Sequence, residues 1–272
     1  MDDIFTRVAH GRTADEVVQQ VESLILDGVL RVGDRLPGER ELSRQLDISR
    51  PILREALKTL EQRGLLTSRH GGGTFIADVI GEIFSQPVME LIARHRRATF
   101  DYLEYRREVE GITAAFAAQR ATQADRELLA GIVQAMKQAH DAADPDREAE
   151  LDVEFHSAIG EAAHNIILLH TLRSCYRLLS NGVFYNRAAI YQYSGSSERL
   201  LEQHIAIFDA IVAGDADGAK GAAERHMEFV AHTLREAERA NDWARVANLR
   251  LQQRAKGGHS DDSKRKTATK RA

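Results

Sequence analysis

The chain has 272 residues, enough for two domains that each enclose a hydrophobic core. Its hydrophobic share of 43% and its charged share of 29% are ordinary for a globular protein. The net charge of −4 argues against a protein that coats nucleic acid through bulk charge, although a sequence-specific reader of DNA needs only a local basic face.

Cysteine content and hydropathy exclude further classes of protein. Cys175 is the only cysteine, which excludes an intrachain disulfide and a cysteine-based zinc knuckle. The N-terminus has no apolar signal core and no run of about eighteen apolar residues occurs, so we expect a cytoplasmic protein without a membrane span. The small number of prolines and the abundance of Ala, Leu, Glu and Arg predict a mostly α-helical chain.

The first predicted helix covers residues 13–28. Its apolar residues recur at helical spacing, at Val17, Val21, Leu24 and Ile25. Thr13 and Glu16 form a capping-box pattern at its start. Turn signals at residues 32–34 and 37–38 then separate this helix from the next one.

Two short helices joined by a tight turn are predicted next. The first covers residues 39–46, and residues 47–49 suffice for a turn between crossed helices, with Ser49 as the cap of the second. Arg50 and Arg54 lie four residues apart near the start of this second helix. They therefore share a face at the end that meets base edges in a DNA-reading helix. Taken singly, such arginines are also typical of a solvated helix face.

A glycine-rich hairpin follows. Two β-prone runs, 65–68 and 74–76, flank a connection that ends in three successive glycines at 71–73. Because glycine has no Cβ atom, this backbone can approach a phosphate or sugar closely. The ordered series of helix, turn, basic helix and glycine-rich hairpin predicts a winged helix-turn-helix with a small β wing. It favours DNA reading over a merely solvated basic face.

The segment from about Thr13 to Ile76 resembles the DNA-binding domain of the GntR family of bacterial transcriptional regulators. The matching motifs are Leu36–Leu42, Ser49–Leu57, Gly64–Leu66 and Gly71–Phe75. The resemblance implies that six positions contact bases and phosphates, namely Arg40, Ser49, Arg50, Arg54, His70 and Gly71. Relatives more often carry Gly at the turn position of Asp47, and Asp tolerates a left-handed backbone better than most residues.

Helical periodicity takes over after a linker near residues 77–83. Amphipathic segments at roughly 100–121, 123–142, 146–163, 166–192, 197–213 and 216–240 predict an all-α bundle. We therefore expect a winged helix-turn-helix domain at 1–78, an all-helical effector- and metal-binding domain at 79–248, and a disordered basic tail at 249–272. The tail either contacts DNA phosphates or only aids solubility.

Histidines and an aspartate in the bundle suggest a metal site. Asp152 and His156 lie four residues apart and so stack on one helix face. His204 and His226 lie on two later helices that a short acidic, glycine-rich loop makes antiparallel neighbours. One Asp and three His suit Zn²⁺, Mn²⁺ or Ni²⁺ with positions left for a ligand. The alternative is a set of hydrogen-bonded core histidines.

Residues from about Phe100 to Arg239 resemble the all-helical FCD effector domain of the FadR branch of the GntR family. The landmarks are Tyr105–Glu110, Asp152–His156, Ala162–Asn165, His204–Ile211, Gly214–Ala216 and His226. The resemblance implies four metal ligands, Asp152, His156, His204 and His226. It also implies that Arg106 meets an organic acid beside the metal, with an interhelical salt bridge to a glutamate as the alternative. Asn165 either lines the effector pocket or caps the next helix.

Within that branch the chain resembles the lactate- and pyruvate-responsive regulators, the LldR and PdhR types. The run Glu161–His170 is similar to both, whereas Asp152 and His156 together with Ala213–Ala219 are more similar to the lactate type. The resemblance implies a small carboxylic acid, such as lactate or pyruvate, as the effector.

These features predict a transcriptional regulator, a repressor, that binds a palindromic double-stranded operator as a homodimer. One winged helix reads only a few base pairs, which is too little for specific binding in a genome. A metal-dependent enzyme is the alternative from another class, but the motif contains no general base, because Glu154 lies on a different helix face from Asp152 and His156. A third interpretation keeps the regulator, with a purely structural metal and a larger ligand such as an acyl thioester.

Overall fold

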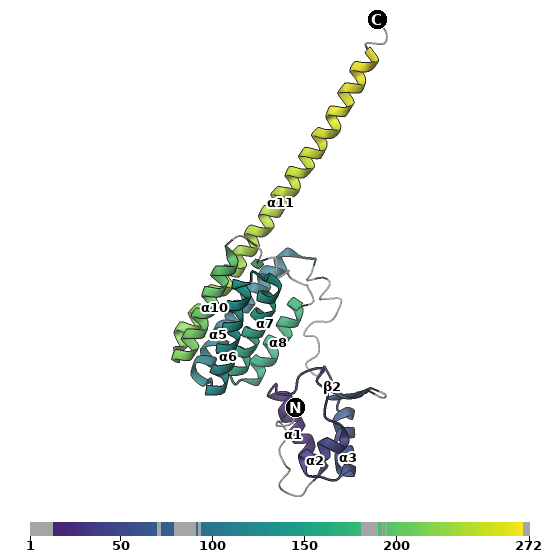
Figure 1. Ribbon diagram of the computed structural model, residues 1–272, viewed down its shortest axis with the longest axis vertical. Helices are drawn as coiled ribbons and strands as arrows, with labels where there is room; N and C mark the ends of the chain where they lie inside the picture. The colour runs from purple at the N-terminus through teal and green to yellow at the C-terminus, as the bar shows by residue number, and fades with distance from the viewer. Residues whose placement is uncertain are drawn as a thin grey trace.

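The computed structural model describes residues 13–69, 72–78, 91, 94–180, 190–191, 193 and 195–268. It shows an N-terminal domain (described residues 13–78) beside a helical bundle, from which one helix extends far beyond the rest (Figure 1). The expected fold class, a winged helix-turn-helix followed by an all-α bundle, is confirmed. Among the residues that the structure describes, no helix is both long and apolar enough to cross a membrane.

The N-terminal domain contains three helices and a two-stranded antiparallel sheet. They are α1 (Ala14–Leu26), α2 (Glu39–Leu46), α3 (Arg50–Gln62), β1 (Leu66–Arg69) and β2 (Gly73–Ile76). The predicted capping box is present, since Thr13 N donates to Glu16 Oε2 at 3.0 Å and Glu16 N donates to Thr13 Oγ1 at 3.4 Å. The core is made by the apolar faces of the three helices, with Val17, Val21, Leu42, Leu46, Leu53 and Leu60 all buried.

Two tight turns set the crossing of these elements. Asp47, at the end of α2, has a left-handed backbone with φ of 56°, as the sequence predicts. Gly64 takes the same region with φ of 73° after α3 and leads into the hairpin. In the sheet, Leu66 pairs with Ile76 and Thr67 pairs with Phe75, so each strand begins one residue away from its predicted start.

The bundle packs the remaining helices around a second core. They are α5 (Arg96–Arg120), α6 (Gln123–Asp141), α7 (Pro145–Ala162), α8 (Ile166–Ser180), α10 (Ser196–Ala213) and α11 (Ala216–Ala268). Phe155 of α7 and Ile207 of α10 are fully buried near the centre of this core. α8 was predicted to continue to about residue 192, and residues 181–189 lie outside the described part of the chain.

The expectation of disorder from residue 249 is corrected, because α11 continues as a helix to Ala268. Residues 244–256 contain strong helix formers such as Ala, Leu, Arg and Gln, with no proline, so helical propensity carries the chain through the predicted boundary. Trp243, Leu249 and Leu251 are nevertheless exposed, and Figure 1 shows this part projecting away from the bundle. These three side chains therefore add nothing to the core.

Candidate nucleic-acid interface and metal centre

The predicted base-reading residues that the structure describes are all exposed. Arg40 lies on α2, Ser49 precedes α3, and Arg50 and Arg54 occupy the first two turns of α3. Ser49 has the extended backbone of an N-cap, but within the described part its side chain makes no capping hydrogen bond, which corrects that expectation. The four residues can therefore face DNA without any rearrangement of the core.

Glu39 holds the two arginines of the reading helix together, a role that sequence reasoning missed. Arg54 Nε donates to Glu39 Oε2 at 2.8 Å, and Arg50 Nη2 lies 3.4 Å from the same oxygen. The three side chains are 62%, 55% and 37% exposed, so each pair is worth only about 0–1 kcal/mol. Another anion could therefore replace Glu39 at little cost, and in this structure Glu39 orients both guanidinium groups.

In the β hairpin, the backbone of Gly73 lies close to the side chain of Arg35. His70 and Gly71, the two wing positions implied by the resemblance, lie outside the described residues. Gly73 has φ of 104°, and a Cβ atom there would lie 2.9 Å from Arg35 Nε. A side chain here would be strained by the left-handed backbone, and the end of the Arg35 side chain would have to move.

The four predicted metal ligands come together from three helices. α7 contributes Asp152 and His156, α10 contributes His204, and α11 contributes His226. All four are buried, and their ligand atoms lie within 4.8 Å of one another. The four-residue spacing on α7 and the antiparallel pairing of α10 with α11 are thus sufficient to assemble the cluster.

The distances within the cluster match those expected around one small cation. His156 Nε2 lies 3.3 Å from His226 Nε2, and His204 Nε2 lies 3.1 Å from Asp152 Oδ1. His156 Nε2 lies 3.7 Å from the same Asp152 oxygen. Tetrahedral ligands at about 2.0–2.1 Å from a metal are roughly 3.3 Å apart, so only small movements would bring these atoms into coordination.

A second layer of polar residues fixes the orientation of the rings. Glu110 Oε2 lies 2.9 Å from His156 Nδ1, and Gln203 Oε1 lies 3.2 Å from His226 Nδ1. Tyr191 donates its hydroxyl proton to Asp152 Oδ1 at 3.3 Å. Carboxylates and amides that hold the far nitrogen of a histidine are typical of metal sites, because they select the tautomer that leaves the near nitrogen free for the metal.

The electrostatics of the layer support this tautomer. Burial favours the protonated form of Glu110, but the charges of Arg106 and His156 outweigh it and hold its pKa well below the usual range. An ionised Glu110 can only accept, so His156 Nδ1 carries a proton where it faces this carboxylate. The pKa of His226 is lowered well below 6.5 by burial and by His204 and His156, which keeps that ring neutral.

Arg106 is buried beside the metal cluster. Two contacts were expected for it, one with an organic acid and one with a glutamate. Its Nε donates to Glu110 Oε1 at 2.6 Å, so Arg106 does pair with a glutamate, but the expected interhelical pair is wrong because Glu110 lies on the same helix. Its Nη2 also donates to Tyr176 at 3.3 Å. With Asp152, Tyr191 and His226, Arg106 lines a small cavity of about 10 Å³. That volume is about what one water molecule needs.

Asn165 has a structural role in this conformation. Its Oδ1 accepts from the backbone N–H groups of Ile167 and Leu168, both at 3.1 Å, and so caps α8. It does not line the cavity beside the metal cluster. The expected cap is therefore confirmed, while a contribution of Asn165 to the effector pocket stays a prediction.

Comparisons with known proteins agree with this architecture. Residues 13–76 match the family model of bacterial regulatory proteins, gntR family, and residues 101–229 match the FCD domain. The chain is 42% identical over 261 residues to an Escherichia coli (strain K12) protein named for regulation of the L-lactate dehydrogenase operon. That alignment covers 94% of this chain and 98% of the relative.

Two further proteins are similar to this chain, one in sequence and one in solved structure. The Glc operon transcriptional activator of Escherichia coli (strain K12) is 33% identical over 228 residues, covering 82% of this chain and 89% of the relative. The solved structure of Streptococcus agalactiae GntR superposes with a TM-score of 0.50 at 27% identity, covering 80% of this chain and 99% of that one. All three relatives are named as regulators or as GntR proteins, in agreement with the expectation that the chain is not an enzyme.

Proposed function

This chain belongs to the gntR family of bacterial regulatory proteins and carries an FCD domain, and we propose that a small organic acid bound at a divalent metal controls its affinity for DNA. The N-terminal domain makes it a DNA-binding transcriptional regulator. The metal, the acid and the residues assigned to them are the proposed parts. The domain boundary near residue 78 is proposed as well, supported by the ranges of the two family matches.

The observation that carries the proposal is the pair of facing imidazole nitrogens. Glu110 Oε2 and Gln203 Oε1 lie beside the Nδ1 atoms of His156 and His226, and the two Nε2 atoms face each other 3.3 Å apart. One shared proton would make this pair an N–H···N hydrogen bond, and a divalent cation bound by both nitrogens is the alternative that the proposal favours. Together with His204 and the Asp152 carboxylate they would hold Zn²⁺, Mn²⁺ or Ni²⁺. Bound there, the metal would supply a Lewis-acid centre for a carboxylate.

The acid is proposed to bind at the open metal positions, with its carboxylate against the metal and beside Arg106. Lactate and pyruvate are the best candidates, because a relative that is 42% identical is named for the L-lactate dehydrogenase operon. The cavity of about 10 Å³ is too small for either acid. Binding must therefore move lining side chains such as Tyr191, and this movement links the acid to the rest of the bundle.

The DNA contacts are proposed to come from Arg40, Ser49, Arg50 and Arg54, together with His70 and Gly71 in the wing. We propose a homodimer on a palindromic operator, because two reading helices related by a two-fold axis double the number of bases read. We further propose that the protein is a repressor that the acid releases from DNA. The relative named as an activator shows that the family also contains proteins that activate transcription.

A thermal-shift screen of small 2-hydroxy and 2-oxo acids tests the effector assignment. The protein is loaded with Zn²⁺, Mn²⁺ or Ni²⁺, and each acid is compared with its amide at equal concentration. We expect lactate or pyruvate to stabilise the loaded protein and not the chelator-treated protein. Stabilisation by an acyl thioester alone would instead favour a structural metal and a larger ligand.

A further inference from the structure

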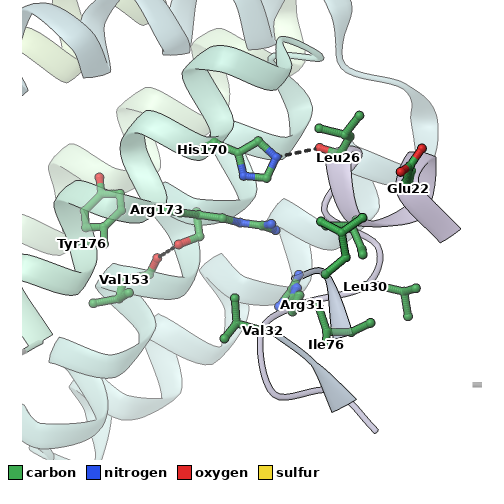
Figure 2. A pocket seen from close by; sticks show the side chains of 13 residues that line it. Glu22, Leu26, Leu30, Arg31, Val32, Ile76, Val153, His170, Arg173 and Tyr176 are labelled. Carbon is green, nitrogen blue, oxygen red and sulfur yellow. Dashed lines mark hydrogen bonds between the residues drawn. The ribbon is translucent and has the colours of Figure 1, made fainter. Parts of the chain in front are cut away.

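A large cavity separates the N-terminal domain from the helical bundle, and the metal cluster does not line it. It measures about 690 Å³, within the range of roughly 300–1,000 Å³ that small-molecule sites occupy. Ile25 and Leu30 line it from the N-terminal domain, and Val153, Ser157 and Tyr176 line it from α7 and α8. Figure 2 shows Leu30 on one side of the cavity facing Val153 and Tyr176 on the other.

The rim of the cavity carries a net positive charge. Arg31 Nη2 and Arg173 Nη2 lie 2.8 Å and 2.7 Å from the same oxygen, Oε1 of Glu161. Two guanidinium groups thus share one carboxylate, and each has further N–H donors for a second anion. Glu22 also lines the cavity, but its carboxylate is neutralised by Arg63 Nη1 at 2.6 Å.

A buried polar atom on the cavity wall has no partner. His170 Nε2 donates to the Leu26 carbonyl at 2.9 Å, which fixes one ring nitrogen as the donor (Figure 2). His170 Nδ1 is buried and lacks a hydrogen-bond partner among the described residues. With Nε2 as the donor, Nδ1 of the neutral ring is an acceptor, so a water molecule or a ligand hydroxyl is the kind of group that would satisfy it.

The side chain of Arg173 contacts residues on both sides of the cavity. Arg173 Nη2 donates to the Gly28 carbonyl at 3.3 Å in addition to its contact with Glu161. A Cβ atom on Gly28, where φ is 73°, would lie only 2.6 Å from Arg173 Nη1. The absence of a side chain at Gly28 is therefore what lets Arg173 reach across from α8 to the N-terminal domain.

We propose that this cavity binds an amphipathic organic carboxylate, with its apolar body among the aliphatic side chains and its carboxylate at Arg31 and Arg173. The mainly aliphatic lining of the cavity favours a ligand with an apolar body. The two arginines at its rim favour an anion over a cation. This second site is independent of the acid proposed at the metal. Asp152 and His156 point from α7 to the metal cluster, whereas Val153 and Ser157 of the same helix face the cavity.

The occupant contacts both domains, so it favours the domain arrangement seen here over others. By linkage, the DNA affinity of the protein must change by the same factor by which DNA changes the affinity for the carboxylate. Tyr176 adds a route to the metal cluster, because it lines the cavity and accepts from Arg106 Nη2. The cavity thus gives the regulator a second chemical input.

Isothermal titration of the full chain with decanoate tests the proposal. We expect saturable binding of one decanoate per chain, and no saturable binding of butyrate or of decylamine, which carries the same chain with a cationic head. The Arg31→Gln variant should bind decanoate about tenfold more weakly, the effect of losing one charge-assisted hydrogen bond. The Val32→Trp variant, which fills the cavity from an exposed position, should abolish binding.

Two controls separate this proposal from general effects. Arg147→Gln removes an exposed arginine paired with Glu150 outside the cavity, and it should leave decanoate binding unchanged. His204→Ala should also leave it unchanged, so a failed metal proposal and a failed cavity proposal give different results. Absence of saturable decanoate binding, equal binding of decylamine, or wild-type affinity in both cavity variants would overturn the proposal.

Discussion

His156 and His226 present their Nε2 atoms to each other at 3.3 Å in the interior of the bundle. The partners of their Nδ1 atoms, Glu110 and Gln203, come from two further helices, α5 and α10. Four helices therefore converge on one pair of ring nitrogens. Two unprotonated nitrogens that face each other in the interior would destabilise the fold, so the pair requires either a shared proton or a cation.

Removal of a ligand should lower metal content. We expect His204→Ala and His226→Ala to bind substantially less divalent metal than the wild type after equal loading and dialysis, measured by elemental analysis. His164→Ala is the matched control, because His164 is an exposed histidine paired with Asp125 and outside the cluster. Wild-type metal content in both cluster variants would show that the cation binds elsewhere.

Glu110→Gln should weaken the metal site through His156. The substitution keeps the volume of the side chain but removes the charge that orients the ring, and loss of such partners lowers metal affinity by about 10–100-fold. The metal dissociation constant should rise by that factor, measured by competition with a chromophoric chelator. Glu108→Gln, an exposed neighbour on the same helix, should have no effect.

Measuring metal affinity together with thermal stability separates the two possible roles of Glu110, which are to orient His156 and to stabilise the fold. Breaking the buried ion pair with Arg106 also lowers the free energy of unfolding, by about 3–5 kcal/mol. If Glu110 acted only in stability, Glu110→Gln would melt at a lower temperature but retain the metal affinity of the wild type. That outcome would contradict the orienting role.

Substitution of the reading-helix arginines should abolish specific operator binding. Arg50→Ala or Arg54→Ala should reduce specific affinity about tenfold or more, because a bidentate arginine–guanine contact is worth roughly 1–3 kcal/mol of discrimination. Metal content and oligomeric state should stay unchanged. Gel-shift titration on an operator selected from random DNA, with Arg147→Ala as the control, measures this. Operator footprints like those of the wild type in both variants would contradict the assignment.

The protein should be a dimer in solution and on DNA. We expect analytical ultracentrifugation at micromolar concentration to give twice the chain mass of 30.4 kDa, and one dimer per palindromic operator. Dimerisation should persist in Arg50→Ala, since that residue lies on the exposed reading face. A monomer, both free and bound to the operator, would contradict the two-fold arrangement.

The sequence predicts those parts of the site that lie on one helix or on adjacent helices. The four-residue spacing of Asp152 and His156 fixes their common face, and the short loop after α10 fixes the pairing of His204 with His226. Glu110 could not be assigned in this way, because its contact with His156 depends on how α5 packs against α7. The only available signal was its position four residues after Arg106, which predicts an ion pair rather than a role at the metal.

Other features depend on tertiary context that local pattern does not contain. Glu39 meets Arg50 and Arg54 only when α2 crosses α3. The cavity between the domains depends on the placement of Gly28 against Arg173, two residues far apart in the chain. In the last part of α11, composition suggested disorder while helix propensity favoured continuation.

Titration of L-lactate into the operator complex, with and without a chelator, tests the link between metal, acid and DNA most directly. For metal-loaded wild type, we predict that L-lactate raises the operator dissociation constant in a saturable way, by the factor that linkage sets. Chelator-treated protein and His226→Ala should bind the operator but not respond to the acid. An unchanged response to L-lactate in metal-stripped protein would contradict the shared site and leave any bound cation a structural role.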